Sequence, residues 1–138
     1  MNMELKGKKE KKSTKVDITP KSIANIIKYS IDGIIAYAKD GKSIIIYSIC
    51  SVIEVILGFV FKVNGLEWIL IICILGFILS IELINTAIEA VCDAVTNEYN
   101  PLIKIAKDCG SGATFIVFIV AIILNIIIFA PKIYYLFV

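Results

Sequence analysis

Three long apolar runs, separated by short polar segments, fill most of the chain after residue 42. Each run approaches or exceeds the ~20 residues that a helix needs to cross a bilayer. We therefore predict three transmembrane helices, at about 43–61, 66–96 and 112–130, the second of which extends about two turns beyond the membrane. A short turn at residues 62–65 and a polar connection at residues 97–110 are expected to join them.

Before the first span, isoleucines recur at intervals of three and four between residues 20 and 40, the spacing of one helix face. Pro20 can open this helix, with Thr19 as its N-cap. Charged residues interrupt the segment too often for it to span, so we expect an amphipathic helix that lies in the membrane interface. Residues 1–19 are Lys-rich and lack a long apolar run, which predicts a disordered, solvated tail.

Composition and charge set the class of protein and its orientation. The chain is 59% apolar, and all fourteen of its positive charges are Lys, ten of them in the first 42 residues. Because cytoplasmic segments are rich in Lys, the N-terminus is expected in the cytoplasm, as is the connection at 97–110. The sequence predicts an all-α protein with one integral-membrane domain at residues 20–138, crossing the cytoplasmic (inner) membrane several times.

The absent and scattered residue types exclude several kinds of chemistry. The chain has no His, which excludes His-based triads, His metal ligands and imidazole acid–base catalysis. Its four cysteines form no CxxC pair, and three lie in apolar runs, so they fit small buried apolar residues better than disulfides or zinc ligands. No nucleic-acid partner is expected.

A polar stripe interrupts the second predicted span. At 100° per residue, five side chains share an arc of about 100° on an otherwise apolar helix: Glu82, Asn85, Thr86, Glu89 and Asp93. An ionisable residue at the bilayer centre costs roughly 2.5–3.5 kcal/mol, and such residues usually mark a functional site. We therefore expect a site at Glu82, Asn85 and Glu89. Asp93 and Glu98, nearer the predicted surface, are expected to be solvated.

The segment after the stripe, "IKIAKDCGSGA", adds Lys107, Asp108 and a cluster of small residues. Small residues at 110–113 fit either close helix packing or the approach of a ligand. Carboxylates hold Mg²⁺, a Lys can neutralise phosphates, and a second carboxylate can accept the proton of an attacking hydroxyl. Together these residues indicate metal-assisted phosphoryl transfer at the cytoplasmic membrane surface.

The run "ELINTAIEAVCDAVTNEYNPLIKIAKDCGSGA", from Glu82 to Ala113, resembles the signature of the small prokaryotic lipid kinases, diacylglycerol kinase and undecaprenol kinase. The segments "NTAIE" and "NEYNPLIKIAKD" resemble the undecaprenol kinases more than the diacylglycerol kinases. The resemblance extends more loosely over about residues 21–129. It implies a homotrimer of three-span chains with an amphipathic surface helix, and an ATP- and Mg²⁺-dependent phosphorylation of a lipid hydroxyl, with undecaprenol preferred over diacylglycerol.

The resemblance also implies roles for individual residues. Glu82 matches the general base on the lipid hydroxyl, Asn85 a polar residue near the phosphates, and Glu89 a Mg²⁺ ligand. Lys107 matches the phosphate-neutralising Lys and Asp108 a nucleotide contact. Tyr29, on the surface helix, matches a Tyr near the nucleotide. Glu98 completes the candidate nucleotide-binding residues.

Two departures from the family pattern affect this expectation. The Glu that shares the metal with the equivalent of Glu89 is Gly41 here, and the His after "EY" is Asn100. Asp40 is adjacent to Gly41, and we hypothesise that it replaces the missing metal ligand.

Two alternatives remain open from the sequence. The first keeps the fold but makes the chain a weak or inactive kinase that binds only lipid or nucleotide. The second is a small transporter subunit that uses Glu54 or Glu82 as a proton or cation site.

Overall fold

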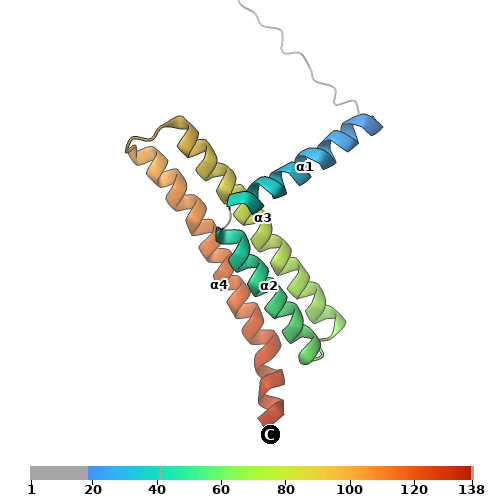
Figure 1. The fold of residues 1–138 in the computed structure, drawn as a ribbon. Helices are drawn as coiled ribbons and strands as arrows, with labels where there is room; N and C mark the ends of the chain where they lie inside the picture. Colours follow the sequence, from blue (N-terminus) through green and yellow to red (C-terminus); the bar gives the residue numbers. More distant parts are fainter. Residues whose placement is uncertain (1–18, 41, 138) are drawn as a thin grey trace, which may run out of the picture. The chain divides into compact units, whose positions relative to one another are not determined.

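The computed structural model describes residues 19–40 and 42–137, with residues 40, 42 and 137 described by their backbone alone. These residues form four α-helices and no strand (Figure 1): α1 (Pro20–Asp40), α2 (Lys42–Val60), α3 (Gly65–Val95) and α4 (Pro101–Phe137). Helices α2, α3 and α4 are each long and apolar enough to cross a membrane, with mean hydropathies of 2.3, 2.4 and 3.0 over an 18-residue stretch of each. The predicted all-α fold with three candidate spans is confirmed. Residues 1–18 of the predicted tail, which was expected at residues 1–19, and Gly41 lie outside the described residues.

Helix α1 begins at a pair of reciprocal hydrogen bonds. The backbone N–H of Thr19 donates to Ser22 Oγ at 2.9 Å, and the N–H of Ser22 donates to Thr19 Oγ1 at 3.2 Å. These bonds satisfy donors that a first helical turn leaves unpaired, and Pro20 has no N–H to satisfy. The predicted start of this helix is confirmed, whereas its place at a membrane surface stays a prediction. The chain divides into two compact units at Asp32, within α1.

Within the second unit, α3 lies along α4 over much of its length and touches α2 less extensively (Figure 1). Ile74 and Ile78 of α3 pack against Val117 and Ala121 of α4. Helices in lipid gain little from the hydrophobic effect, so close van der Waals packing must hold them together, and a small residue such as Ala121 favours that packing. The α3–α4 hairpin is therefore the part of the fold that can position a site.

The turn between α2 and α3 is built by close packing and a helix cap. A Cβ at residue 58 would lie 2.6 Å from Trp68 Cη2, so Gly58 allows α2 to approach α3. Asn64 Oδ1 accepts hydrogen bonds from the N–H groups of Leu66 and Glu67 at 3.0 Å, and Glu67 Oε2 accepts from the Asn64 N–H at 2.7 Å. This capping box starts α3 and explains why the predicted turn is so short.

The connection between α3 and α4 is shorter than the sequence predicts. Residues 97–110 were expected to form a polar connection, but α4 already begins at Pro101. Asn100 Oδ1 accepts a hydrogen bond from the N–H of Leu102 at 2.9 Å and so caps α4, while Pro101 fits the first helical position. The prediction of a connection through residue 110 is therefore wrong. Helix α4 continues to Phe137, beyond the predicted end of the third span near residue 130, and has Pro131 inside it.

Candidate functional site

The polar stripe lies on α3, which is continuous from Gly65 to Val95. Glu82, Asn85 and Glu89 are half-buried, and Asp93 is exposed. Asn85 Nδ2 donates a hydrogen bond to Glu89 Oε1 at 2.8 Å, one helical turn further along the same face. Two of the predicted site residues are thus joined directly. Glu82 lies roughly 10 Å from Glu89 along the helix axis, at ~1.5 Å per residue.

Gly110 of α4 faces Asn85 at the helix–helix contact. A Cβ at residue 110 would overlap Asn85 Oδ1, whereas a Cβ at residue 112 would meet nothing within 4 Å. Asn85 Oδ1 is buried, and none of the described residues gives it a hydrogen bond. Of the two expectations for the small-residue cluster, close packing is thus realised at Gly110, where it makes room for the Asn85 side chain.

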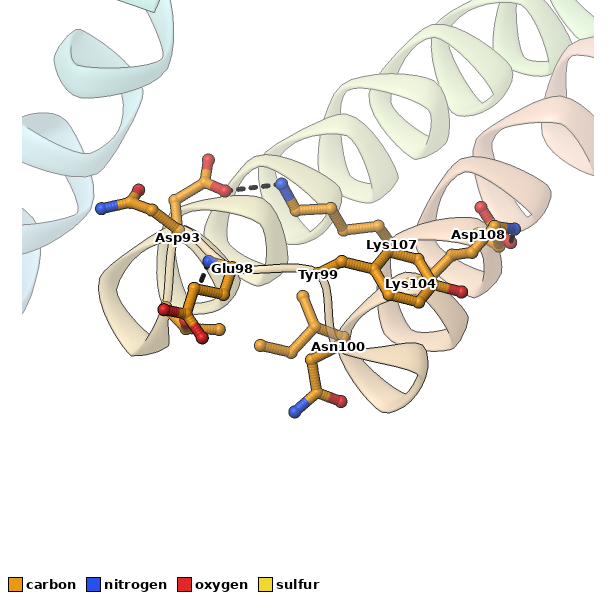
Figure 2. Close-up of a pocket in the computed structure, with 10 residues that line it drawn as sticks. Asp93, Glu98, Tyr99, Asn100, Lys104, Lys107 and Asp108 are labelled. Carbon is orange, nitrogen blue, oxygen red and sulfur yellow. Dashed lines mark hydrogen bonds and ion pairs between the residues drawn. The ribbon is translucent and has the colours of Figure 1, made fainter.

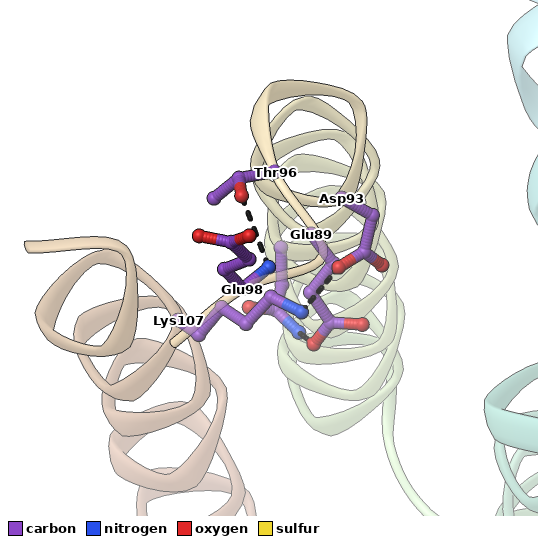
Figure 3. A network of polar contacts seen from close by, with 6 residues as sticks. Glu89, Asp93, Thr96, Glu98 and Lys107 are labelled. Carbon is purple, nitrogen blue, oxygen red and sulfur yellow. Dashed lines mark hydrogen bonds and ion pairs between the residues drawn. The ribbon is translucent and has the colours of Figure 1, made fainter. Parts of the chain in front are cut away.

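Lys107 reaches from α4 across to α3. Its Nζ lies 2.5 Å from Asp93 Oδ1, in an ion pair whose side chains are 38% and 66% exposed respectively. Figure 3 shows the Lys107 side chain pointing toward the α3 face that carries Glu89 and Asp93. Asp93 is exposed, as expected for a solvated residue, but it is ion-paired, which the sequence did not indicate. The two residues are 14 positions apart on different helices, across a connection that is shorter than predicted, so no local pattern could have found the pair.

A pocket of 490 Å³ opens at the α3–α4 connection (Figure 2). Three candidate residues line it, Glu98, Lys107 and Asp108, and so do seven others: Asp93, Thr96, Asn97, Tyr99, Asn100, Ile103 and Lys104. Lys104 Nζ lies 2.5 Å from Asp108 Oδ2, one turn further along α4. The i,i+4 spacing of this pair would have revealed it had the segment been predicted as helical. The pocket thus combines two Lys side chains, which can contact phosphate oxygens, with three acids, two of which already pair with these Lys side chains.

The remaining candidate residues are not placed at this pocket. Tyr29 is an exposed residue of α1, and its approach to the nucleotide stays a prediction. The side chain of Asp40 lies outside the described part of the chain. Its proposed role as a metal ligand also stays a prediction.

The carboxylate oxygens of the stripe fit a Mg²⁺ ion better than a metal that is held entirely by protein ligands. The described residues contain no group of three or more His, Cys, Asp or Glu side chains that could hold a metal ion. Mg²⁺ usually keeps several waters and binds through one or two carboxylates plus substrate phosphates. The Glu89 carboxylate, oriented by Asn85 and close to a pocket with two Lys side chains, fits that mode of binding.

Glu54, the one acid of the first span, lies apart from this pocket. Asn125 Nδ2 of α4 donates to Glu54 Oε1 at 3.1 Å and to the carbonyl oxygen of Ala121 at 3.0 Å. Polar side chains that hydrogen-bond across helices commonly hold membrane bundles together. This contact gives Glu54 a packing role between α2 and α4.

The sequence is similar to known proteins over most of its length. The model of the prokaryotic diacylglycerol kinase family matches residues 28–129. The chain is 39% identical to an undecaprenol kinase of Bacillus subtilis over 83 residues, 60% of this chain and 66% of that protein. It is 35% identical to a diacylglycerol kinase of Pseudomonas aeruginosa over 96 residues, 70% and 78% of the two chains.

A diacylglycerol kinase of Escherichia coli K12 is 41% identical over 61 residues, 44% of this chain and 50% of that protein. The chain thus spans just under two thirds of the Bacillus relative and half of the Escherichia relative. The family model, in contrast, covers the first candidate span, the polar stripe and the pocket together. The chain belongs to the prokaryotic diacylglycerol kinase family.

Proposed function

We propose that this protein is a membrane lipid kinase that transfers the γ-phosphoryl group of ATP to a lipid hydroxyl, with Mg²⁺ as cofactor. One observation carries the proposal: the half-buried acids of α3 lead from an apolar helix segment to a pocket lined by Lys104 and Lys107. A lipid hydroxyl and a nucleotide phosphate can therefore approach the same helix face from opposite directions. Family membership supports the same reaction.

The reaction assigns a different task to each polar group. The lipid oxygen forms a bond to the γ-phosphorus, the bond to the β–γ bridging oxygen breaks, and ADP leaves. Glu82, within the apolar part of α3, accepts the proton of the lipid hydroxyl. Lys107 neutralises charge on the phosphates. Asn85 orients the Glu89 carboxylate through its 2.8 Å hydrogen bond.

Glu89 would hold Mg²⁺, and Asp40 is the proposed second ligand in place of the family Glu that is Gly41 here. The ion, when bound, supplies charge neutralisation on the phosphates. Glu98 and Asp108 line the pocket and would contact the nucleotide there. Tyr29 is proposed to approach it from α1.

The acceptor lipid, assembly and location complete the proposal. Undecaprenol is preferred over diacylglycerol, which the likeness to a protein named undecaprenol kinase supports. A homotrimer is proposed because three spans are few to enclose half-buried acids such as Glu82. The pocket is proposed to face the cytoplasm from the inner membrane, because the Lys-rich N-terminus and the Lys of the pocket belong on that side.

A test compares phosphorylation of the two lipids. The full chain in lipid nanodiscs is supplied with labelled ATP, Mg²⁺ and either undecaprenol or diacylglycerol, and labelled lipid phosphate is measured. We expect faster turnover with undecaprenol and its loss in Glu89→Gln. Glu67→Gln, which changes an α3 acid far from the pocket, should keep the wild-type rate. Equal rates in Glu89→Gln and wild type would refute the role of Glu89.

The second candidate function is a weakened kinase. It is favoured by Gly41, which stands where the family resemblance implies a metal-binding Glu. If Asp40 replaces the lost ligand, Asp40→Ala should abolish Mg²⁺-dependent turnover. If it does not, turnover should be low in the wild type and rise in Gly41→Glu. A wild type that binds nucleotide but phosphorylates neither lipid would identify a degenerate member of the family.

A further inference from the structure

The Asp93–Lys107 ion pair connects the surface end of the polar stripe to the candidate phosphate-binding Lys. Asp93 lies on α3, one helical turn beyond Glu89, and Lys107 lies on the second turn of α4. Both residues line the pocket at the connection. Asp93 is therefore in direct contact with a group that the proposed reaction uses, although it has no role of its own in that reaction.

The ion pair restricts a flexible side chain without using all of its donors. A Lys ammonium has three N–H donors on a four-carbon stem with many rotamers. One donor is bound by Asp93 Oδ1, and the ammonium is held over the α3 face that carries Glu89 (Figure 3). Two donors remain for phosphate oxygens. Asp93 thus restricts where Lys107 can meet a phosphate.

We propose that Asp93 is a positioning residue that holds the Lys107 ammonium on the α3 side of the pocket, one helical turn from Glu89, where the transferred phosphoryl group is bound. This inference rests on the proposed kinase function and deepens it. Orientation of a charged group before the reaction lowers the barrier for transfer. The Asp93 carboxylate also repels the nucleotide phosphates and competes with them for Lys107, so it opposes nucleotide binding.

These two effects give a signature that a structural ion pair would not give. Loss of the Asp93 charge should lower kcat, because Lys107 is no longer oriented, without raising KM for ATP. A pair that only joined α3 to α4 would lower stability alone. The Glu67–Lys132 pair provides a control, because it joins the same two helices near the opposite end of α3, with Lys132 Nζ 2.8 Å from Glu67 Oε2.

The experiment measures kcat and KM for ATP in nanodiscs for Asp93→Asn, Asp93→Glu, Glu67→Gln, Lys107→Gln and the Asp93→Asn/Lys107→Gln double variant. An exposed ion pair contributes a free energy that corresponds to a change of up to about fivefold in an equilibrium constant. We expect Asp93→Asn to lower kcat about fivefold with KM unchanged or lower, Asp93→Glu to restore most of kcat, and Glu67→Gln to match wild type. In the Lys107→Gln background, Asp93→Asn should have no further effect.

Three kinetic outcomes would overturn the inference. They are wild-type kcat in Asp93→Asn, a raised KM with unchanged kcat, and an equal effect of Asp93→Asn with and without Lys107. The first two would show that Lys107 needs no orientation by Asp93. The third would show that Asp93 does not act through Lys107.

Nucleotide binding separates failure of this inference from failure of the kinase proposal. If wild type phosphorylates neither lipid, the kinase proposal fails, and affinity for a non-hydrolysable ATP analogue becomes the readout. Asp93→Asn should then bind the analogue severalfold more tightly, and only when Lys107 is present. Unchanged affinity, or a wild type that binds no analogue, would refute the role of Asp93.

Discussion

Asn85 and Gly110 face each other across the α3–α4 contact so closely that a Cβ at residue 110 would overlap Asn85 Oδ1. The opposite end of the same amide donates to Glu89. The glycine is thus linked, through one side chain, to the orientation of the proposed metal ligand. A residue without a side chain therefore contributes to the geometry of the site from the neighbouring helix.

Gly110→Ala should lower kinase turnover strongly and should change thermal stability little. The added methyl displaces the Asn85 side chain and breaks its hydrogen bond to Glu89, and a misplaced catalytic group can cost roughly 100-fold in rate. The rate of lipid phosphorylation and the temperature of unfolding would be measured for wild type and Gly110→Ala in the same nanodiscs. Gly112→Ala, whose Cβ meets nothing within 4 Å, is the control and should behave as wild type. Equal rates for the two variants would contradict the proposed link.

Asn125→Leu should destabilise the fold. Asn125 donates to Glu54 at 3.1 Å, and its loss leaves a half-buried carboxyl of the first span without that donor. An unsatisfied buried polar group costs about 1–3 kcal/mol. The midpoint of unfolding in detergent mixtures should therefore fall. Glu54→Leu added to Asn125→Leu removes the unpaired carboxyl and should recover part of the loss; a double variant less stable than Asn125→Leu would count against this explanation.

Asn64→Ala should lower stability by about 1 kcal/mol, the usual contribution of an N-cap. Asn64 Oδ1 accepts from the N–H groups of Leu66 and Glu67, and alanine has no acceptor for them. Asn64→Asp keeps an oxygen acceptor and is the matched control. Activity per folded molecule should not change, because this cap lies at the opposite end of α3 from the pocket. A fall in kcat in the folded fraction would show coupling between the two ends.

Asn100→Ala tests whether the departure from the family His has a structural reason. Asn100 Oδ1 caps α4 at 2.9 Å, so its loss should fray the turn that carries Lys104. We expect weaker nucleotide binding by severalfold, measured with a fluorescent ATP analogue. Asn100→Asp retains the cap and should bind nearly as well as wild type if capping, rather than the amide itself, is what matters.

Local sequence signals were sufficient for most of the fold. Thr19 before Pro20 indicated the start of α1, and the short polar turn between two apolar runs indicated the end of α2 and the start of α3. Asn100 before Pro101 is the same kind of signal, and it marks the start of α4. The residues after Pro101 include charged side chains like those of a loop, so the hydrophobic pattern does not show that they form the first turns of α4.

Only the part of the candidate site that lies on a single helix could be predicted from the sequence. Glu82, Asn85 and Glu89 could be placed on one face because a single helical period relates them. The contacts of Asp93 with Lys107 and of Glu54 with Asn125 join positions 14 and 71 residues apart. They depend on the length of a connection and on the way in which three helices pack, which the hydrophobic pattern does not determine.

The ion pairs at the two ends of the α3–α4 hairpin also determine how it can sit in a membrane. Glu67 and Asp93 are roughly 39 Å apart along α3, and a bilayer's hydrocarbon core is ~30 Å thick. If the hairpin sank by one turn, ~5.4 Å, in either direction, it would draw a charged pair toward hydrocarbon. In a membrane, the two pairs would therefore limit how far the hairpin can shift in either direction. A thicker or thinner bilayer must be accommodated by tilt or by local deformation of the lipid, so the proposed activity should depend on acyl-chain length.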